Sequence, residues 1–284
     1  MFNKASSSTT EQIKNQSKKL KLEISERVRV LCLHGYRQNG DSFKSKLGSL
    51  RKQVSKYADF VFISAPHVAE QLDKPEENGS NMIVEKDQLS WWFNSEDGKT
   101  FKATNRNAVA YKFEESVRFV ENIWMAEGPF QGLLGFSQGA CFVGLIAGLA
   151  KMHMTKIRPN FVILSSGFIS GSLAHVNYFD EPIEIPSLHI FGESDDIVTP
   201  QMSKALAKHF EHCEILTHPG GHYFPATAVQ KPIYLNFFQD RLQDYLEEKE
   251  LSRMKAEGLL KFEVSDNSDI SENNFPDAED SDES

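Results

Sequence analysis

The chain is 284 residues long, with 40% hydrophobic and 11% aromatic residues, enough apolar side chain to fill a sizeable core. Its formal net charge of −9 is unevenly distributed along the chain, because nine of the 40 acidic residues lie between 262 and 284, where there is no Lys or Arg. The rest of the chain carries 31 acidic and 31 basic residues, so it offers no basic field for nucleic acid or an anionic membrane.

Both ends of the chain are polar and differ in composition from the middle. We predict a disordered extension over residues 1–26, one folded domain over 27–250, and an acidic, disordered tail over 251–284 that could bind a basic protein partner. There is no apolar signal segment and no run of roughly 18 apolar residues, and the three cysteines lack motif spacing. We therefore expect a protein of the cytoplasm, with the nucleus as the alternative.

Short buried strands alternate with amphipathic helices along the folded domain. Most of the strands are near-continuous apolar runs, which is typical of parallel strands covered on both faces. The predicted strands are Val28–Leu33, Phe60–Ser64, Gln131–Leu134, Phe161–Ser165, Ser187–Phe191 and Cys213–Thr217. The predicted helices are Asp41–Tyr57, Asn105–Met125, Gln138–His153, Gln201–Phe210 and Ala226–Glu250. The alternation predicts an α/β fold with a mostly parallel six-stranded sheet and helices on both of its faces.

One connection is too long for this plan. Residues 67–104 separate the second predicted strand from its helix, and they contain Trp91-Trp92-Phe93. A connection of this length in a compact domain usually has a function, often as a lid or a binding loop. Because three adjacent large aromatic residues are costly to leave in water, we favour a lid-like loop folded over the sheet edge rather than a solvated insertion.

The segment Leu133–Ala140 reads LLGFSQGA, an apolar strand that runs into Gly-x-Ser-x-Gly and then into a helix of small and apolar residues. This is the context of a nucleophile elbow, a turn so sharp that the hydroxyl of Ser137 stands alone at the edge of the sheet. Gly135 and Gly139 provide positions without a Cβ on either side of the turn. The alternative is an ordinary Gly-rich turn between a strand and a helix.

A serine hydroxyl needs a base to take its proton and a third group to orient that base. The chain has an acid and a histidine in suitable places, since Asp195 and His222 each follow a predicted strand. The order Ser137, Asp195, His222 is that of α/β-hydrolases, with one strand between the nucleophile and the acid.

For the acid and for the histidine, the sequence offers two candidates that lie close together. Asp195 and Asp196 are adjacent, so only one can face the imidazole, and we choose Asp195 because it lies three residues past the turn glycine and ahead of an apolar pair. We prefer His222 to His218 because the two glycines before His222 allow a loop to cross the sheet edge.

The loop after the first strand reads HGYRQNG. In this arrangement that loop supplies one oxyanion donor and the residue after the nucleophile supplies the other, so we assign the backbone N–H groups of Tyr36 and Gln138. His34 precedes the turn that carries Tyr36, and we interpret it as a residue that fixes the backbone of this turn. The sequence has no H-E-x-x-H, C-x-x-C, P-loop or dinucleotide-binding pattern, and we expect no cofactor and no metal.

Six stretches together resemble one family: VLCLHGYRQNG, ISAPH, WWF, GLLGFSQGA, HIFGESDDIVTP and HPGGHYFP. The chain looks like the serine hydrolases that include the ovarian-cancer-associated animal esterase and its fungal relatives, over about residues 28–246. The resemblance implies an α/β-hydrolase fold and carboxylesterase activity, with Ser137, Asp195 and His222 as the triad. GFSQG also occurs in acyl-protein thioesterases, so a thioesterase or lysophospholipase-like hydrolase is the alternative.

The sequence therefore predicts a metal-independent serine esterase whose small-molecule substrate is an ester with an apolar acyl chain. A second class remains open, a non-catalytic α/β-hydrolase that binds a small ligand in the same cleft. The residues predicted to line that cleft are Tyr36, Trp91, Trp92, Phe168, Tyr223 and Phe224.

Overall fold

The computed structural model describes residues 26–69 and 88–259. The predicted N-terminal extension, apart from its last residue, and the part of the acidic tail from residue 260 on lie outside the described residues. The chain divides into a first unit that ends at Glu247 and a second that begins at Glu248. In the second unit, Arg253 pairs with Glu250 and Glu257 along the end of a helix.

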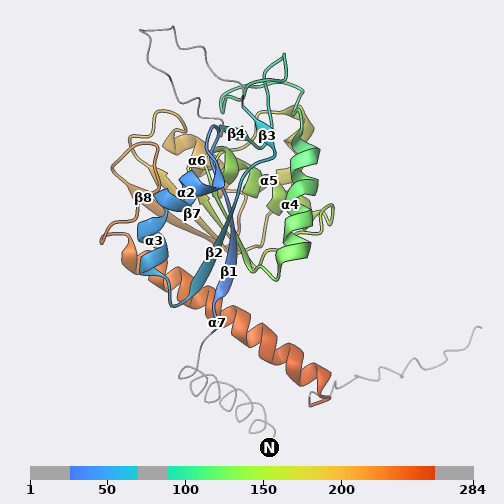
Figure 1. The fold of residues 1–284 in the computed structure, drawn as a ribbon, viewed down its shortest axis with the longest axis vertical. Helices are drawn as coiled ribbons and strands as arrows, with labels where there is room; N and C mark the ends of the chain where they lie inside the picture. Colours follow the sequence, from blue (N-terminus) through green and yellow to red (C-terminus); the bar gives the residue numbers. More distant parts are fainter. Residues whose placement is uncertain (1–25, 70–87, 260–284) are drawn as a thin grey trace, which may run out of the picture. The chain divides into compact units, whose positions relative to one another are not determined.

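A six-stranded sheet is the centre of the first unit, and its strand order is β2-β1-β5-β6-β7-β8 (Figure 1). All neighbouring strands in it are parallel. The strands are β1 (Val28–Leu33), β2 (Ala58–Ile63), β5 (Gly132–Phe136), β6 (Phe161–Ser165), β7 (Ser187–Gly192) and β8 (Cys213–His218). This confirms the predicted sheet. Because all strands run the same way, the loops after β1, β5, β7 and β8 meet at one edge.

The helices are α2 (Gly40–Lys46), α3 (Gly48–Gln53), α4 (Phe113–Glu127), α5 (Gln138–Lys151), α6 (Pro200–Ala207) and α7 (Lys231–Ala256), with a 3₁₀ helix η1 (Leu173–Phe179). Helix α7 continues to Ala256, so the first six residues of the tail predicted to be disordered over 251–284 are helical. Apart from such shifts at helix ends, two of the helices differ from the prediction. The helix expected over Asp41–Tyr57 is interrupted at Leu47, which ends α2 and precedes α3. None of the helices within the described ranges is long and apolar enough to cross a bilayer.

The second difference concerns α4, which begins at Phe113 rather than at Asn105. The residues before it make bridges instead of a helix, since Asn107 pairs with Ser172 and Tyr111 pairs with Phe93. Lys112 then adopts a left-handed conformation with φ 67°, which breaks any continuous helix across this point. Tertiary pairing therefore overrides the helical spacing of this segment.

The core has two layers, one on each face of the sheet. Alternate residues of a strand point to opposite faces, so Leu31 and Leu33 of β1 belong to one cluster and Val30 and Cys32 to the other. Helices α4, α5 and α6 supply side chains to the first cluster, and α2, α3 and α7 supply the second. Figure 1 shows α4 on one side of the strands and α2 and α3 on the other. The prediction of helices on both faces is confirmed.

The long connection after β2 contains an antiparallel pair, β3 (His67–Val68) with β4 (Leu89–Ser90). Trp91 and Trp92 follow β4 and have no solvent-exposed surface. Residues 90–94 of this connection are therefore packed into the protein, whereas Val68, Glu96, Asp97 and Lys99 are exposed. The predicted lid also includes residues 70–87, which lie outside the described residues.

Candidate active site

Ser137 lies in the turn between β5 and α5, with φ 54° and ψ −115°. A residue with a side chain rarely adopts a positive φ, so the surrounding structure must hold it there. The backbone is tight on both sides of the serine. A Cβ on Gly135 would lie 2.5 Å from Ala140 N, and one on Gly139 would lie 2.5 Å from His34 O. The turn is thus the sharp elbow that the glycine spacing predicts.

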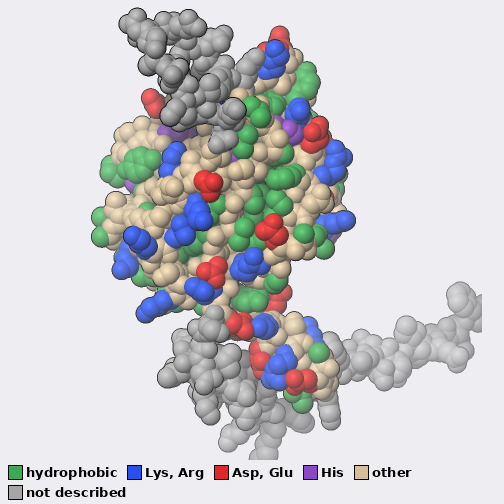
Figure 2. Space-filling model, viewed as in Figure 1, with side chains coloured by type: hydrophobic (Ala, Val, Ile, Leu, Met, Phe, Trp, Pro, Cys, Tyr) green, Lys and Arg blue, Asp and Glu red, His purple; other side chains and the backbone are tan. Residues whose placement is uncertain are grey.

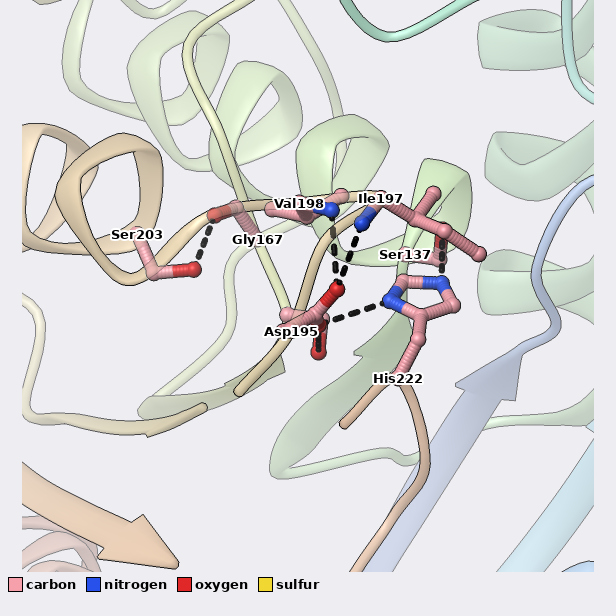
Figure 3. Close-up of polar contacts among 8 residues, drawn as sticks. Ser137, Gly167, Asp195, Ile197, Val198, Ser203 and His222 are labelled. Carbon is pink, nitrogen blue, oxygen red and sulfur yellow. Dashed lines mark hydrogen bonds and ion pairs between the residues drawn. The ribbon is translucent and has the colours of Figure 1, made fainter. Parts of the chain in front are cut away.

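His222 contacts both of the other residues predicted for the triad (Figure 3). Its Nε2 lies 2.9 Å from Ser137 Oγ, and its Nδ1 lies 2.8 Å from Asp195 Oδ2. Because Nδ1 donates its proton to the carboxylate, Nε2 is free to accept the proton of the serine hydroxyl. The three side chains come from the loops after β5, β7 and β8, and the fold brings them together at one edge of the sheet.

Asp195 is buried, with 3% of its surface exposed, and its carboxylate accepts four hydrogen bonds. The donors are His222 Nδ1, Ser166 Oγ at 2.9 Å, Ile197 N at 3.0 Å and Val198 N at 2.9 Å. This is the pattern of an ionised carboxylate held in a fixed direction. The adjacent Asp196 is exposed. The structure therefore brings Asp195 to the imidazole, which is the aspartate chosen from the sequence.

Sequence reasoning missed Ser166. It follows β6, the strand between those that lead to Ser137 and Asp195, and it has a φ of 48°. Its hydroxyl donates to Asp195 Oδ2 beside His222, so it helps to orient the acid. The only signal in the sequence is a serine at the end of a strand next to the nucleophile's strand, which is too common to single it out.

The loops that carry Asp195 and His222 are joined by hydrogen bonds. Glu193 N donates to His218 O at 2.7 Å, and Ser194 N donates to Gly220 O at 3.1 Å. His218 itself ends β8, and its buried ring lies 4.7 Å from the ring of Tyr223. Burial lowers the pKa of His218 from its ordinary value. His218 therefore packs within the loop, while the chain beyond it brings His222 to the serine.

The loop after β1 lies against the elbow, since a Cβ on Gly35 would be 3.4 Å from Ser137 Cβ. His34 Nδ1 donates to Gly35 O at 2.8 Å, and His34 Nε2 accepts from Ala65 N at 2.9 Å. Burial lowers the pKa of His34 to about 4, so it is neutral at pH 7 and can fill both roles. The Gly35 carbonyl and the Tyr36 N–H belong to one planar peptide unit, so this contact also sets the direction of the N–H.

The two predicted oxyanion donors are both available in the described part of the chain. The N–H of Tyr36 donates to none of the described residues. Gln138 is the first residue of α5, where a backbone N–H has no partner within the helix. The positive end of the helix dipole is also at this position.

A pocket of about 530 Å³ opens beside Ser137 and His222. Three of the predicted cleft residues line it: Tyr36, Tyr223 and Phe224. Its other described lining residues are Gly35, Gln38, Phe43, Lys46, Phe136 and Ile197. Lys46 is the only one of the described lining residues with a formal charge. Nothing in the sequence marks it, because only the packing of α2 against the sheet places it there.

The structure does not place the other three predicted cleft residues at this pocket. Trp91 and Trp92 are completely buried and pack against Phe142 of α5. Phe168 is 2% exposed and borders a separate pocket that also includes Arg106. Their aromatic character reflects the core of the protein rather than the lining of the cleft.

Within residues 26–69 and 88–259 there is no group of three or more His, Cys, Asp or Glu side chains placed to hold an ion.

The parallel sheet and the serine elbow at its edge are those of the α/β-hydrolase class. The acyl-protein thioesterase 2 of Zea mays has a similar structure, with a TM-score of 0.51 over 78% of this chain and 96% of that chain. It is 16% identical in sequence, so the likeness concerns the fold. The predicted α/β-hydrolase fold is confirmed.

Sequence comparison identifies the family. Residues 24–232 match the family described as Serine hydrolase (FSH1). Esterase GA18864 of Drosophila pseudoobscura pseudoobscura is 59% identical over 247 residues, which cover 87% of this chain and 83% of that protein. Esterase OVCA2 of Homo sapiens is 37% identical over 215 residues, which cover 74% of this chain and 95% of that protein. The chain belongs to the FSH1 family of serine hydrolases, which confirms the resemblance noted in its sequence.

Proposed function

We propose that this serine hydrolase is a carboxylesterase that cleaves acyl esters through a covalent acyl-enzyme. The observation that carries the proposal is the chain of hydrogen bonds from Ser137 Oγ through both nitrogens of His222 to Asp195. Such a chain lets an imidazole take the serine proton while a carboxylate stabilises the resulting imidazolium. The names of the relatives, which are esterases, favour oxygen esters as substrates.

In the first half of the reaction, Ser137 Oγ attacks the ester carbonyl and His222 Nε2 takes the hydroxyl proton. The carbonyl oxygen becomes an oxyanion, which the N–H groups of Tyr36 and Gln138 would stabilise. Collapse of this intermediate breaks the bond to the alcohol oxygen, and His222 returns the proton to the departing alcohol. The acyl group is then bound to Ser137 as an ester.

In the second half, water replaces the alcohol. His222 accepts a proton from the water as its oxygen attacks the acyl carbon, and the same two N–H groups stabilise the second oxyanion. The bond to Ser137 Oγ then breaks, and the serine recovers its proton from His222. The carboxylic acid leaves, and the enzyme returns to its starting state.

The pocket favours a substrate with an apolar part. Its described lining is mostly aromatic and aliphatic, and Tyr223 and Ile197 leave 50% and 56% of their surface exposed at its rim. This lining can cover an acyl chain without leaving polar groups unpaired. Lys46 adds one positive charge at the rim. Figure 2 shows that basic side chains gather over α2 and α3, the helices that carry Lys44, Lys46, Arg51 and Lys52.

The test combines covalent labelling with turnover. The wild-type protein should react with a fluorophosphonate probe and hydrolyse p-nitrophenyl esters, while Ser137→Ala should lose labelling and several orders of magnitude in kcat. Ser203→Ala is the matched control, because Ser203 is a buried serine whose hydroxyl donates to Gly167 O rather than to a triad residue. A folded wild-type protein with no labelling and no turnover would refute the proposal and favour a non-catalytic, ligand-binding role.

Paired substrates distinguish an esterase from a thioesterase. An oxygen ester and a thioester with the same acyl chain share the acyl-enzyme, so any difference in kcat/KM comes from the acylation step. We expect the oxygen ester to be the better substrate. A thioester preference at every chain length would assign the protein to the thioesterase alternative.

A further inference from the structure

The segment Leu89–Trp92, which includes β4 and the two tryptophans after it, lies between the two loops that carry the proposed oxyanion donors. These loops are about 100 residues apart in the sequence, and the donors are backbone N–H groups. Their positions therefore depend on what holds the backbone on each side. Hydrogen bonds from this one segment reach the backbone or side chains on both sides.

The first loop, which carries Tyr36, is bound to the segment on both sides of that residue. Arg37 N donates to Leu89 O at 2.9 Å, and Leu89 N donates to Gln38 O at 3.0 Å. Before the tyrosine, the indole Nε1 of Trp91 donates to His34 O at 2.8 Å. Three hydrogen bonds thus limit the rotation of the peptide units around the Tyr36 N–H.

The second loop is held through the side chain of Gln138, which has no exposed surface. Its Oε1 accepts from Trp91 N at 3.1 Å, and its Nε2 donates to Trp92 O at 2.8 Å and to Ser90 Oγ at 3.1 Å. Both amide hydrogens are thereby used, as a buried amide requires. The residue whose backbone is proposed to bind the oxyanion is fixed by its own side chain.

Trp91 connects the two loops directly. Its backbone N–H binds Gln138 and its indole N–H binds His34 O, while its ring lies 5.2 Å from the ring of His34 and 5.3 Å from that of Phe142. The side chain is completely buried. A shift of Trp91 would therefore move both proposed donors relative to each other.

We propose that Leu89–Trp92 is a positioning element of the oxyanion hole, in which Trp91 and the Gln138 side chain set the distance and direction of the Tyr36 and Gln138 N–H groups. This inference rests on the proposed esterase function. Oxyanion donors accelerate a reaction because they are aimed in advance at the place where charge develops. The described part of the long connection then acts in the chemical step, in addition to any role as a cover for the pocket.

The two adjacent tryptophans provide a matched pair of variants. Trp91→Phe removes an indole N–H that binds His34 O. Trp92→Phe removes an equally buried indole N–H that has no hydrogen-bond partner among the described residues. Both changes remove the same atoms from the core, so the loss of packing is common to the two variants. The difference between them reports the contact with the first loop.

The measurements are kcat, KM and the affinity of a boronic acid that forms a tetrahedral anionic adduct with the serine. Loss of one whole oxyanion donor costs about 10²–10³ in rate, so displacing a donor in Trp91→Phe should lower kcat by about 10–100-fold. KM should stay within about twofold, because the contact acts in the transition state. The affinity of the boronic acid should fall in step with kcat, and Trp92→Phe should lose much less of both.

Gln138→Met tests the second loop, because it keeps the backbone N–H and removes the amide that binds the segment. It should reproduce the fall in kcat and in boronic acid affinity. Ser90→Ala, which removes one partner of that amide, is the milder variant if the others fail to fold. The inference is overturned if the folded variants keep the wild-type kcat, if only KM changes, or if Trp91→Phe and Trp92→Phe lose kcat equally. The proposed function fails separately, by absent labelling and turnover in the wild-type protein.

Discussion

Adding one methyl group at Gly139 should disable the elbow, while the same addition at Gly144 of the same helix should be harmless. A Cβ at Gly139 would lie 2.5 Å from His34 O, and Leu33 O is also within its contact distance. Both obstacles are backbone atoms at the end of β1, which cannot rotate away. At Gly144 the nearest atoms are the side-chain ends of Leu206 and Leu164, at 3.4 and 3.5 Å, which is ordinary van der Waals contact.

The magnitude follows from these distances. To restore normal contact, β1 and α5 must separate by roughly 1 Å at Gly139, and overpacking of this kind costs about 1–3 kcal/mol or more. Replacing glycine by alanine within a helix recovers at most about 1 kcal/mol, and Gly144→Ala should keep that gain in full. For a domain of this size, Gly139→Ala should lower Tm by about 3–8 °C and Gly144→Ala should raise it by about 2–4 °C.

Activity should separate the two variants further. The strain at Gly139 moves Gln138, which carries one proposed oxyanion donor, and His34, which lies two residues before the other donor, Tyr36. The value of kcat should therefore fall by at least about 100-fold. The assays are thermal unfolding by circular dichroism and ester turnover under the same conditions. A Gly139→Ala protein with the Tm and kcat of the wild type would contradict the close-approach argument, and so would a Gly144→Ala protein that loses several degrees in Tm.

Three further predictions concern charge and protonation. Asp195→Asn should lower kcat by about 10³–10⁴-fold, because the amide cannot stabilise an imidazolium. Asp196→Asn, which changes the exposed neighbour, should leave kcat within twofold of the wild-type value. Equal losses of kcat in the two variants would mean that the acid is assigned wrongly. Burial lowers the pKa of His34 and of His175 to about 4, so the unfolded chain binds protons at pH 4–6.5 that the folded protein does not. The free energy of unfolding should therefore fall as the pH drops from 6.5 to 4, by up to about 3 kcal/mol for each histidine, and urea denaturation that gave a flat profile would contradict this. Lys46→Glu should raise KM more for an ester that carries a carboxylate than for a neutral ester of equal length. This difference in KM should become smaller in high salt, which screens the charge. Equal changes in KM would show that the charge of Lys46 does not affect substrate binding.

Local patterns were sufficient for the sheet and for the three side chains of the proposed triad. Parallel strands covered on both faces are apolar along most of their length, so β1, β6 and β7 are visible as short, mostly apolar runs. The elbow is also a local feature, because its glycines are required within two residues of Ser137. Once that strand is placed, the acid and the histidine are expected after later strands, where Asp195 and His222 are found.

The rest depends on contacts between residues that are far apart in the sequence. Asn105–Lys112 has helical spacing but pairs with Phe93 and Ser172, and Trp91 and Trp92 have the chemistry of a binding loop but fill the core. Burial and pairing of this kind depend on which elements become neighbours, which a single segment does not encode. The sequence by itself determined where the strands lie and which residues could react. Only the tertiary structure decided where the aromatic side chains pack, which residues line the pocket and which groups hold the backbone donors, because those are properties of surfaces that meet only after folding.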